Sequence, residues 1–169
     1  MCFLHPPGGL GGSISAFGSE PLPRYRQLEH TSDVKVAIYG RDLAELFANA
    51  AFCLFDLMLD LPRVEAKQQK TIELESADLP ELFLDWLREL LFLFSTHGFA
   101  VSRAEVRIQS LGPSVPGSLG PCSLSAVLLG EPYVLERHGL KVEVKTPTYH
   151  EYKLESSADG YKATLVLDV

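Results

Sequence analysis

Residues 42–58 read DLAELFANAAFCLFDLM, and their apolar residues recur at the i, i+3, i+4 and i+7 positions of one helix face. Residues 78–94, DLPELFLDWLRELLFLF, repeat the same spacing. Asp42 and Asp78 stand where an acidic side chain can cap a helix N-terminus. The two stretches therefore predict two amphipathic helices, each with an apolar face wide enough to pack against a sheet.

Further residues mark where the two helices begin and end. Glu45 and Glu81 follow the two caps at the spacing of a capping box, in which the acid returns a hydrogen bond to the cap. Pro62 bounds the first helix, because proline cannot continue a helix interior. Gly98 ends the second helix, since glycine readily adopts the left-handed backbone of a C-terminal cap.

Outside the helices, apolar and polar residues alternate with the period of two that is typical of strands. The predicted strands cover residues 34–38, 72–75, 103–108, 123–129, 148–154 and 161–169, with Val142 and Val144 leading into the fifth. Residues 111–121, rich in Pro, Gly and Ser, predict a long, flexible hairpin loop. The turns between the C-terminal strands are too short for crossover helices. The sequence therefore predicts an α+β fold, with two amphipathic helices packed on one face of a mostly antiparallel β-sheet in a single domain.

Composition limits the function classes. The chain has 169 residues, 46% hydrophobic and 22% charged, as in a soluble globular protein. Its net charge of −7 argues against strong direct binding to nucleic acid, so any link to RNA would run through a protein partner. Cys2, Cys53 and Cys122 are too widely spaced for a zinc site or a disulfide framework, and Cys53 is expected to be a small buried apolar residue.

The N-terminal segment has a different composition from the rest. Residues 1–23 are rich in Gly, Pro and Ser, which predicts a disordered extension followed by a domain over residues 24–169. The start lacks the basic and apolar regions of a secretory signal, and no run is long enough to span a membrane. We therefore expect a cytoplasmic protein.

Two acids stand at the ends of predicted strands that are far apart in sequence. Asp33 opens the first strand and Asp168 closes the last, one residue before Val169. If these strands pair antiparallel, both carboxylates and the terminal carboxylate of Val169 meet at one sheet edge. Three hard oxygen donors are the ligand set that Ca²⁺ or Mg²⁺ prefers. The alternative is a solvated acidic tail, and the strand period alone does not decide between the two.

A second polar concentration is Lys145-Thr146-Pro147-Thr148-Tyr149-His150. Lys145 can neutralise nearby carboxylates, while His150 and His30 are open to three roles: metal ligand, proton carrier or structural hydrogen-bonding residue. The sequence has no GxSxG, Walker A, GxGxxG or HExxH motif. No catalytic residue is assigned, and a stand-alone metal-dependent hydrolase is the least favoured alternative.

Six blocks of the sequence, in order, resemble the archease family. They are residues 29–34 (EHTSDV), 43–51, 85–91, 130–132, 145–150 and 167–169. The resemblance covers about Arg24 to Val169, and the blocks are specific together although each is weak alone. Residues 1–23 have no counterpart, and the 111–121 loop is longer than usual. Ser32 stands for a common alanine and Lys35 for a frequent glycine, and we expect neither to touch a metal ligand.

The resemblance implies a protein co-factor rather than an enzyme. Archeases promote guanylylation and multiple turnover of the tRNA-splicing ligase RtcB, which joins RNA ends with GTP and Mn²⁺. By motif, Asp33, Asp168 and the Val169 carboxylate would hold a divalent cation, Ca²⁺ foremost, with Mg²⁺ or Mn²⁺ as alternatives. His30, Lys145, Tyr149 and His150 would lie near that site or face the partner. A chaperone or modulator of a tRNA methyltransferase or another RNA-modifying enzyme is the alternative function.

Overall fold

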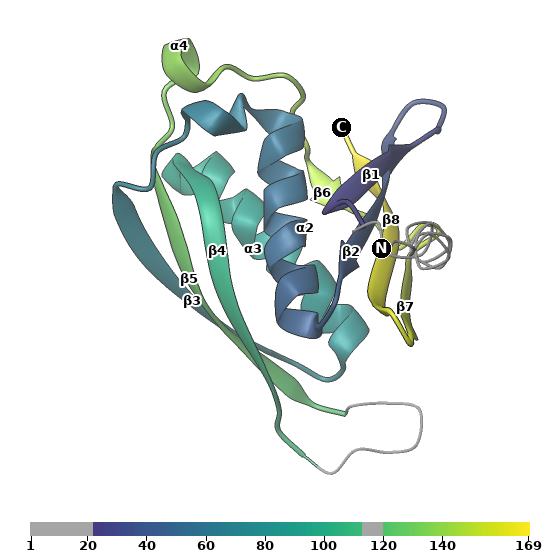
Figure 1. The fold of residues 1–169 in the computed structure, drawn as a ribbon. Helices are drawn as coiled ribbons and strands as arrows, with labels where there is room; N and C mark the ends of the chain where they lie inside the picture. The colour runs from purple at the N-terminus through teal and green to yellow at the C-terminus, as the bar shows by residue number, and fades with distance from the viewer. Residues whose placement is uncertain (1–21, 113–119) are drawn as a thin grey trace, which may run out of the picture.

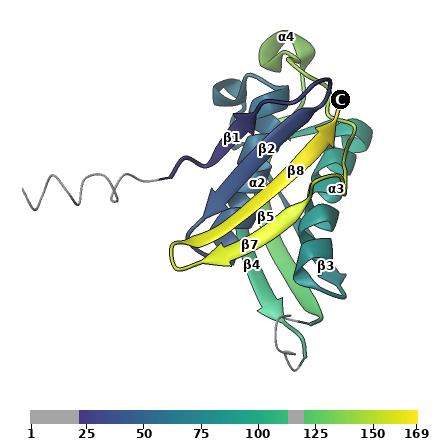
Figure 2. The same ribbon diagram turned by 90° about the vertical axis from the view of Figure 1, so that its right-hand side faces the viewer.

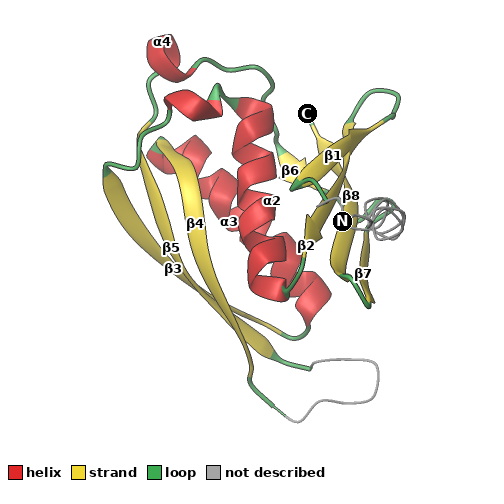
Figure 3. Ribbon diagram, in the orientation of Figure 1, coloured by secondary structure: helices red, strands yellow, loops and turns green. Residues whose placement is uncertain are grey.

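The computed structural model describes residues 22–112 and 120–169. Figure 1 shows two sheets with the two long helices between them, and the same layers appear by element type in Figure 3. In chain order the elements are β1 (Tyr25–Leu28), β2 (Val34–Gly40), α2 (Leu43–Met58), η1 (Leu61–Arg63), β3 (Gln68–Ser76), α3 (Leu79–His97), β4 (Phe99–Ser110), β5 (Cys122–Pro132), α4 (Leu135–His138), β6 (Thr146–Pro147), β7 (Lys153–Ser157) and β8 (Gly160–Asp168).

The first sheet joins the two ends of the described chain. Its strands run in the order β1-β2-β8-β6. The strand β7 also pairs with β8, along residues 160–164, whereas β6 pairs with residues 167–168. Every pairing is antiparallel, and β2 meets β8 from Val34 opposite Leu167 to Gly40 opposite Tyr161. Figure 2 views this sheet face-on, with β8 at its centre and the helices behind it. The last strand thus lies inside the sheet and not at its edge.

The second sheet has three antiparallel strands in the order β3-β5-β4, so that β5 lies between the two earlier strands. Its inner face is apolar and its outer face carries charge at alternate positions, among them Arg103, Glu105 and Arg107 of β4. The β4–β5 pairing continues to Ser110 opposite Cys122, which confirms the predicted hairpin. Residues 113–119 of its loop lie outside the described residues, as do residues 1–21 of the predicted extension.

The core lies between the two sheets, and both helices contribute to it from more than one side. Trp86 of α3 is fully buried and donates its indole N–H to the carbonyl of Phe47 in α2 at 2.8 Å. Leu84 of α3 is buried outside the predicted apolar face, because a helix between two sheets is covered on two sides. Cys53 of α2 is buried, as predicted. Burial of Cys53 raises the pKa of its thiol, as expected of a small core residue.

The predicted helix caps are confirmed, but the capping-box hydrogen bonds predicted for Glu45 and Glu81 are not formed. Asp42 accepts the backbone N–H of Glu45, Asp78 accepts that of Glu81, and Gly98 caps α3 with a φ of 61°. The carboxylate of Glu45 accepts from the backbone N–H of Arg41 and not from Asp42. That of Glu81 is directed at Tyr149 and Arg88 instead of returning to its cap.

The α+β class and the antiparallel pairing are confirmed, but the predicted single sheet is divided into two. The predicted strand over residues 148–154 is confirmed only for Lys153 and Leu154, which belong to β7. Residues 148–152 form a loop between β6 and β7, and Glu151 within it has a positive φ of 54°, outside the range of a regular strand. The short strand β1, which pairs with β2 at the edge of the first sheet, was not predicted.

Gly130 of β5 is required by the close approach of β4. A Cβ placed on Gly130 would lie 1.9 Å from the carbonyl oxygen of Ala100, beside the irregularity in the ladder between Val101 and Arg103. We predict that Gly130→Ala lowers the free energy of unfolding by at least ~2 kcal/mol, because backbone atoms must move to admit the methyl group.

Urea unfolding of the two proteins measures this difference. Gly112→Ala is the matched control, since among the described residues a Cβ there meets the side chain of Pro121 at an ordinary 3.8 Å. Equal stability of Gly130→Ala and Gly112→Ala would contradict the prediction.

Candidate functional site

The register of the first sheet brings Asp33 and Asp168 to the same end of the β2–β8 ladder. Val34 is paired with Leu167, and Asp33 directly precedes Val34 while Asp168 directly follows Leu167. Thr146 of β6 is paired with Asp168 on its other side. We call Asp33 and Asp168 the acidic pair.

The acidic pair has the chemistry of a cation site. Both residues are half-buried, and within residues 22–112 and 120–169 neither carboxylate has a hydrogen bond or ion pair from another side chain. Two neighbouring carboxylates without a positive partner repel each other, so a bound cation would relieve that repulsion. Val169, also half-buried, adds its terminal carboxylate one residue later. These oxygen donors fit a hard divalent cation.

Lys145 reaches this edge through its backbone. Its N–H donates to the carbonyl oxygen of Asp168 at 2.7 Å, which continues the β6–β8 ladder and places Lys145 opposite Val169. Its side chain is exposed at the end of the strand. The structure therefore brings Lys145, predicted from its motif, to the terminal residue beside the acidic pair.

The loop of residues 148–152 is held on two sides. Thr148 donates both its N–H and its hydroxyl to the carbonyl oxygen of Val166, at 3.0 and 2.9 Å. On the other side the Tyr149 hydroxyl donates to Glu81 at 2.8 Å, and the Tyr152 hydroxyl donates to the carbonyl of Pro80 at 2.7 Å. The loop thus spans from the first sheet to the N-terminal end of α3. Tyr149, predicted near the site, faces that helix and is 61% exposed.

Two of the predicted residues, His30 and His150, contact a third residue, Glu151, that was not predicted. Nε2 of His30 and Nε2 of His150 each lie 3.3 Å from Oε2 of Glu151, and the two rings are 6.2 Å apart. We call His30, His150 and Glu151 the histidine cluster. Lys35 of β2 donates to the other oxygen of Glu151 at 2.9 Å. Lys35 therefore touches none of the predicted metal ligands, as expected, yet it belongs to this neighbouring cluster.

Sequence patterns carried no signal for Glu151. It follows His150 directly, and in a strand two adjacent residues would point to opposite faces. The left-handed backbone at Glu151 turns the chain instead and places both side chains together. Among the described residues, no other non-glycine residue has a positive φ.

A second charged cluster lies at the C-terminal end of β5. Glu131 and His138 are both buried, and Nε2 of His138 lies 3.0 Å from Oε2 of Glu131. Nδ1 of His138 accepts the N–H of Val134, which assigns the ring proton to Nε2 and makes it a donor to Glu131. The same carboxylate oxygen accepts the backbone N–H of Glu65 at 2.8 Å. These bonds fasten α4 to the segment before β3, so the cluster is structural.

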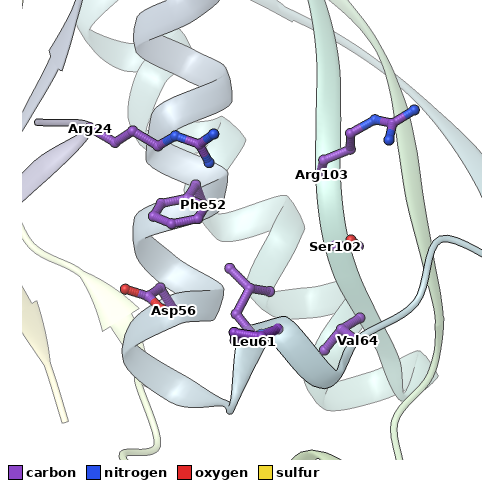
Figure 4. A pocket seen from close by; sticks show the side chains of 8 residues that line it. Arg24, Phe52, Asp56, Leu61, Val64, Ser102 and Arg103 are labelled. Carbon is purple, nitrogen blue, oxygen red and sulfur yellow. The ribbon is translucent and has the colours of Figure 1, made fainter.

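A shallow pocket opens on another face, between α2, η1 and β4 (Figure 4). Arg24 extends over α2 toward the pocket, with its guanidinium carbon 4.2 Å from the centre of the Phe52 ring, while the side chain of Arg103 on β4 points away from Arg24. Asp56 at its wall accepts the hydroxyl of Tyr25 at 2.6 Å. The pocket is thus separate from the acidic pair and offers no pairing of nucleophile and base.

The lengths and hydropathy of the helices test the prediction that no segment is long enough to span a membrane. Within the described residues, none of the helices is both long enough and apolar enough to cross a membrane.

Fold and site together define a small α+β protein whose polar residues gather where its first and last strands meet. A family model described as the Archease protein family (MTH1598/TM1083) matches residues 25–169. The chain is 37% identical to the protein archease of Methanosarcina acetivorans over 146 residues, covering 86% of this chain and 96% of the relative. It is 39% identical to that of Pyrobaculum islandicum over 146 residues, covering 86% and 95%. The chain therefore belongs to the archease family.

Two solved structures share the fold. The solution structure of protein 1598 from Methanobacterium thermoautotrophicum matches with a TM-score of 0.71 at 30% identity, covering 86% of this chain and 99% of that one. The crystal structure of an archease from Thermotoga maritima, described as a possible chaperone, matches with a TM-score of 0.52 at 21% identity, covering 85% and 96%. The second likeness supports the fold alone.

The ion pair between Lys35 and Glu151 generates a testable pH effect. The hydrogen bond from Lys35, followed by that from His30, lowers the pKa of the Glu151 carboxyl from its ordinary value. A carboxyl with a lowered pKa in the folded state stabilises the fold above its unfolded pKa, and this contribution is lost as pH falls through the folded pKa. We predict that Lys35→Met returns the pKa of Glu151 toward its ordinary value.

Carbon-13 NMR titration of the Glu151 side-chain carboxyl measures the change. Lys153→Met is the control, because Lys153 is an exposed lysine of β7 outside the cluster. An unchanged Glu151 titration in Lys35→Met would refute the assignment of the shift to this contact.

Proposed function

We propose that this chain activates an RNA ligase of the RtcB type, by promoting guanylylation of the ligase and its multiple turnover in tRNA splicing or RNA repair. The acidic pair is the observation that carries the proposal: Asp33 and Asp168 flank the last pair of the β2–β8 ladder, Val34 with Leu167. The partner class is the one that the archease resemblance of the sequence implies.

The residues at the end of the β2–β8 ladder have the chemistry to hold a cation. Asp33, Asp168 and the carboxylate of Val169 would hold a divalent cation, with Ca²⁺ favoured and Mg²⁺ or Mn²⁺ as alternatives. When bound, the cation supplies positive charge that attracts phosphate oxygens. Lys145, beside Val169, adds a second positive charge at the same edge. Both features would favour contact with the nucleotide or the metal centre of a partner enzyme.

The charge of the chain supports a protein partner over direct RNA binding. Its net charge of −7 opposes a phosphate backbone, so its link to tRNA would be indirect. We propose that it acts in the cytoplasm as a protein co-factor and performs no reaction by itself. Tyr149 lies beside His150 on the loop of residues 148–152 and is largely exposed. We propose that it faces the partner.

We predict that Asp33→Asn and Asp168→Asn each reduce the stimulation of ligase guanylylation at least tenfold, because each removes a charged ligand (roughly the effect of losing a metal-site residue). The measurement is the rate of GMP transfer to the cognate ligase with and without this chain. Asp159→Asn in the exposed β7–β8 turn is the matched control and keeps full stimulation. Absence of stimulation by the unchanged chain, or full stimulation by Asp168→Asn, would sink the proposal.

A second candidate function is a chaperone or modulator of a tRNA methyltransferase or another RNA-modifying enzyme. Membership of the archease family is the ground for it, since one archease, that of Thermotoga maritima, is described as a possible chaperone. This function would suppress aggregation of the enzyme or change its specificity, and it would not depend on Asp168. Light scattering of the methyltransferase with unchanged chain and with Asp168→Asn separates the two candidates.

A further inference from the structure

We propose that the histidine cluster binds a divalent transition-metal ion of the zinc type, through Nε2 of His30, Nε2 of His150 and Oε2 of Glu151. These donor atoms all lie within 4.8 Å of one another. The site involves different residues from the acidic pair and does not depend on the proposed function.

The spacing of the donor atoms supports shared ligation. Each histidine Nε2 lies 3.3 Å from Oε2 of Glu151, which is long for a hydrogen bond between a charged nitrogen and a carboxylate, about 2.7–2.9 Å. Two donors bound to one tetrahedral zinc ion by bonds of about 2.0–2.2 Å are about 3.3–3.6 Å apart. The spacing of each histidine from Glu151 therefore suits two ligands of one ion.

The donor types select the class of metal. Two imidazole nitrogens and one carboxylate oxygen suit zinc and its first-row neighbours, whereas calcium and magnesium prefer oxygen donors throughout. Three protein ligands leave one tetrahedral position open, as in zinc sites that bind a further ligand. His150 has a side chain that is 68% exposed, so the open position faces solvent. An anionic oxygen from water, a carboxylate or a phosphate would complete it.

Two further features hold Glu151 in a ligating position. Lys35 donates to Oε1 at 2.9 Å, which leaves Oε2 available and fixes the carboxylate in the manner of an outer-shell partner. The backbone of Glu151 has a φ of 54°, in the left-handed region that is unfavourable for a residue with a Cβ. This conformation turns the Glu151 carboxylate toward the two histidine rings. The competing explanation is that Glu151 only neutralises Lys35 and the two histidines.

Cobalt and zinc titrations of the full chain decide between these explanations. Co²⁺ alone added to the unchanged chain should give the visible d–d bands of a four-coordinate ion. Zn²⁺ alone, followed by calorimetry, should bind with one equivalent at this site and displace the cobalt. His150→Ala and Glu151→Gln should each weaken Zn²⁺ binding at least tenfold and abolish the cobalt bands, since loss of a ligand costs at least about as much as loss of an outer-shell partner. Both residues are exposed, so circular dichroism should show an intact fold.

Two control variants separate this site from others. His97→Ala removes an exposed histidine of α3 away from the cluster, and Asp168→Asn removes a carboxylate of the acidic pair. Both should keep the cobalt bands. Absence of the bands in the unchanged chain, or their persistence in both His150→Ala and Glu151→Gln, would overturn the proposal. Loss of the bands in Asp168→Asn alone would assign the ion to the acidic pair and overturn it equally. Because no ligase is present, failure here leaves the proposed function untouched.

Discussion

Antiparallel pairing of β2 with β8 is the constraint on which the rest of the structure depends. It joins residues 34–40 to residues 161–167 and places the last strand in the middle of the first sheet, where β1, β6 and β7 complete it. The inner face of these strands then covers α2, while the outer face and the strand ends carry the polar residues. One register therefore sets both the closure of the core and the position of the acidic pair. A shift of one residue would exchange the two faces of β8 and bury Asp168.

The two polar groups near this pairing differ in how they are built. The acidic pair lies at the end of a regular ladder, since Asp33 directly precedes Val34 and Asp168 directly follows Leu167. The histidine cluster depends on an irregular segment, because His150 and Glu151 lie on a loop anchored to Val166 and to α3. The acidic pair offers oxygen donors alone, whereas the histidine cluster combines two imidazole nitrogens with the carboxylate of Glu151.

Features set by regular structure could be predicted from the sequence, whereas those set by the irregular loop and by the pairing of distant strands could not. Periodicity predicted α2 and α3 with their caps, because these features depend on local pattern. It left open whether Asp33 and Asp168 meet, since that depends on which strands pair. Glu151 was missed, and residues 148–152 were assigned to a strand, because a single left-handed residue changes the direction of the chain without changing its alternation. The division into two sheets also escaped prediction. Which strands pair is decided by tertiary contacts, so Leu84 became buried on a side that a single sheet would leave open.

The position of β8 also affects the order in which the protein can fold during synthesis. The second sheet and both long helices are complete by Pro132. The first sheet must wait for residues 160–168 to leave the ribosome before β2 can pair with β8. Contacts between segments so far apart form slowly, because the long intervening chain must first close into a loop. Until then β2 has β1 at one edge and lacks β8 at the other, and this partly formed state is the one most exposed to aggregation.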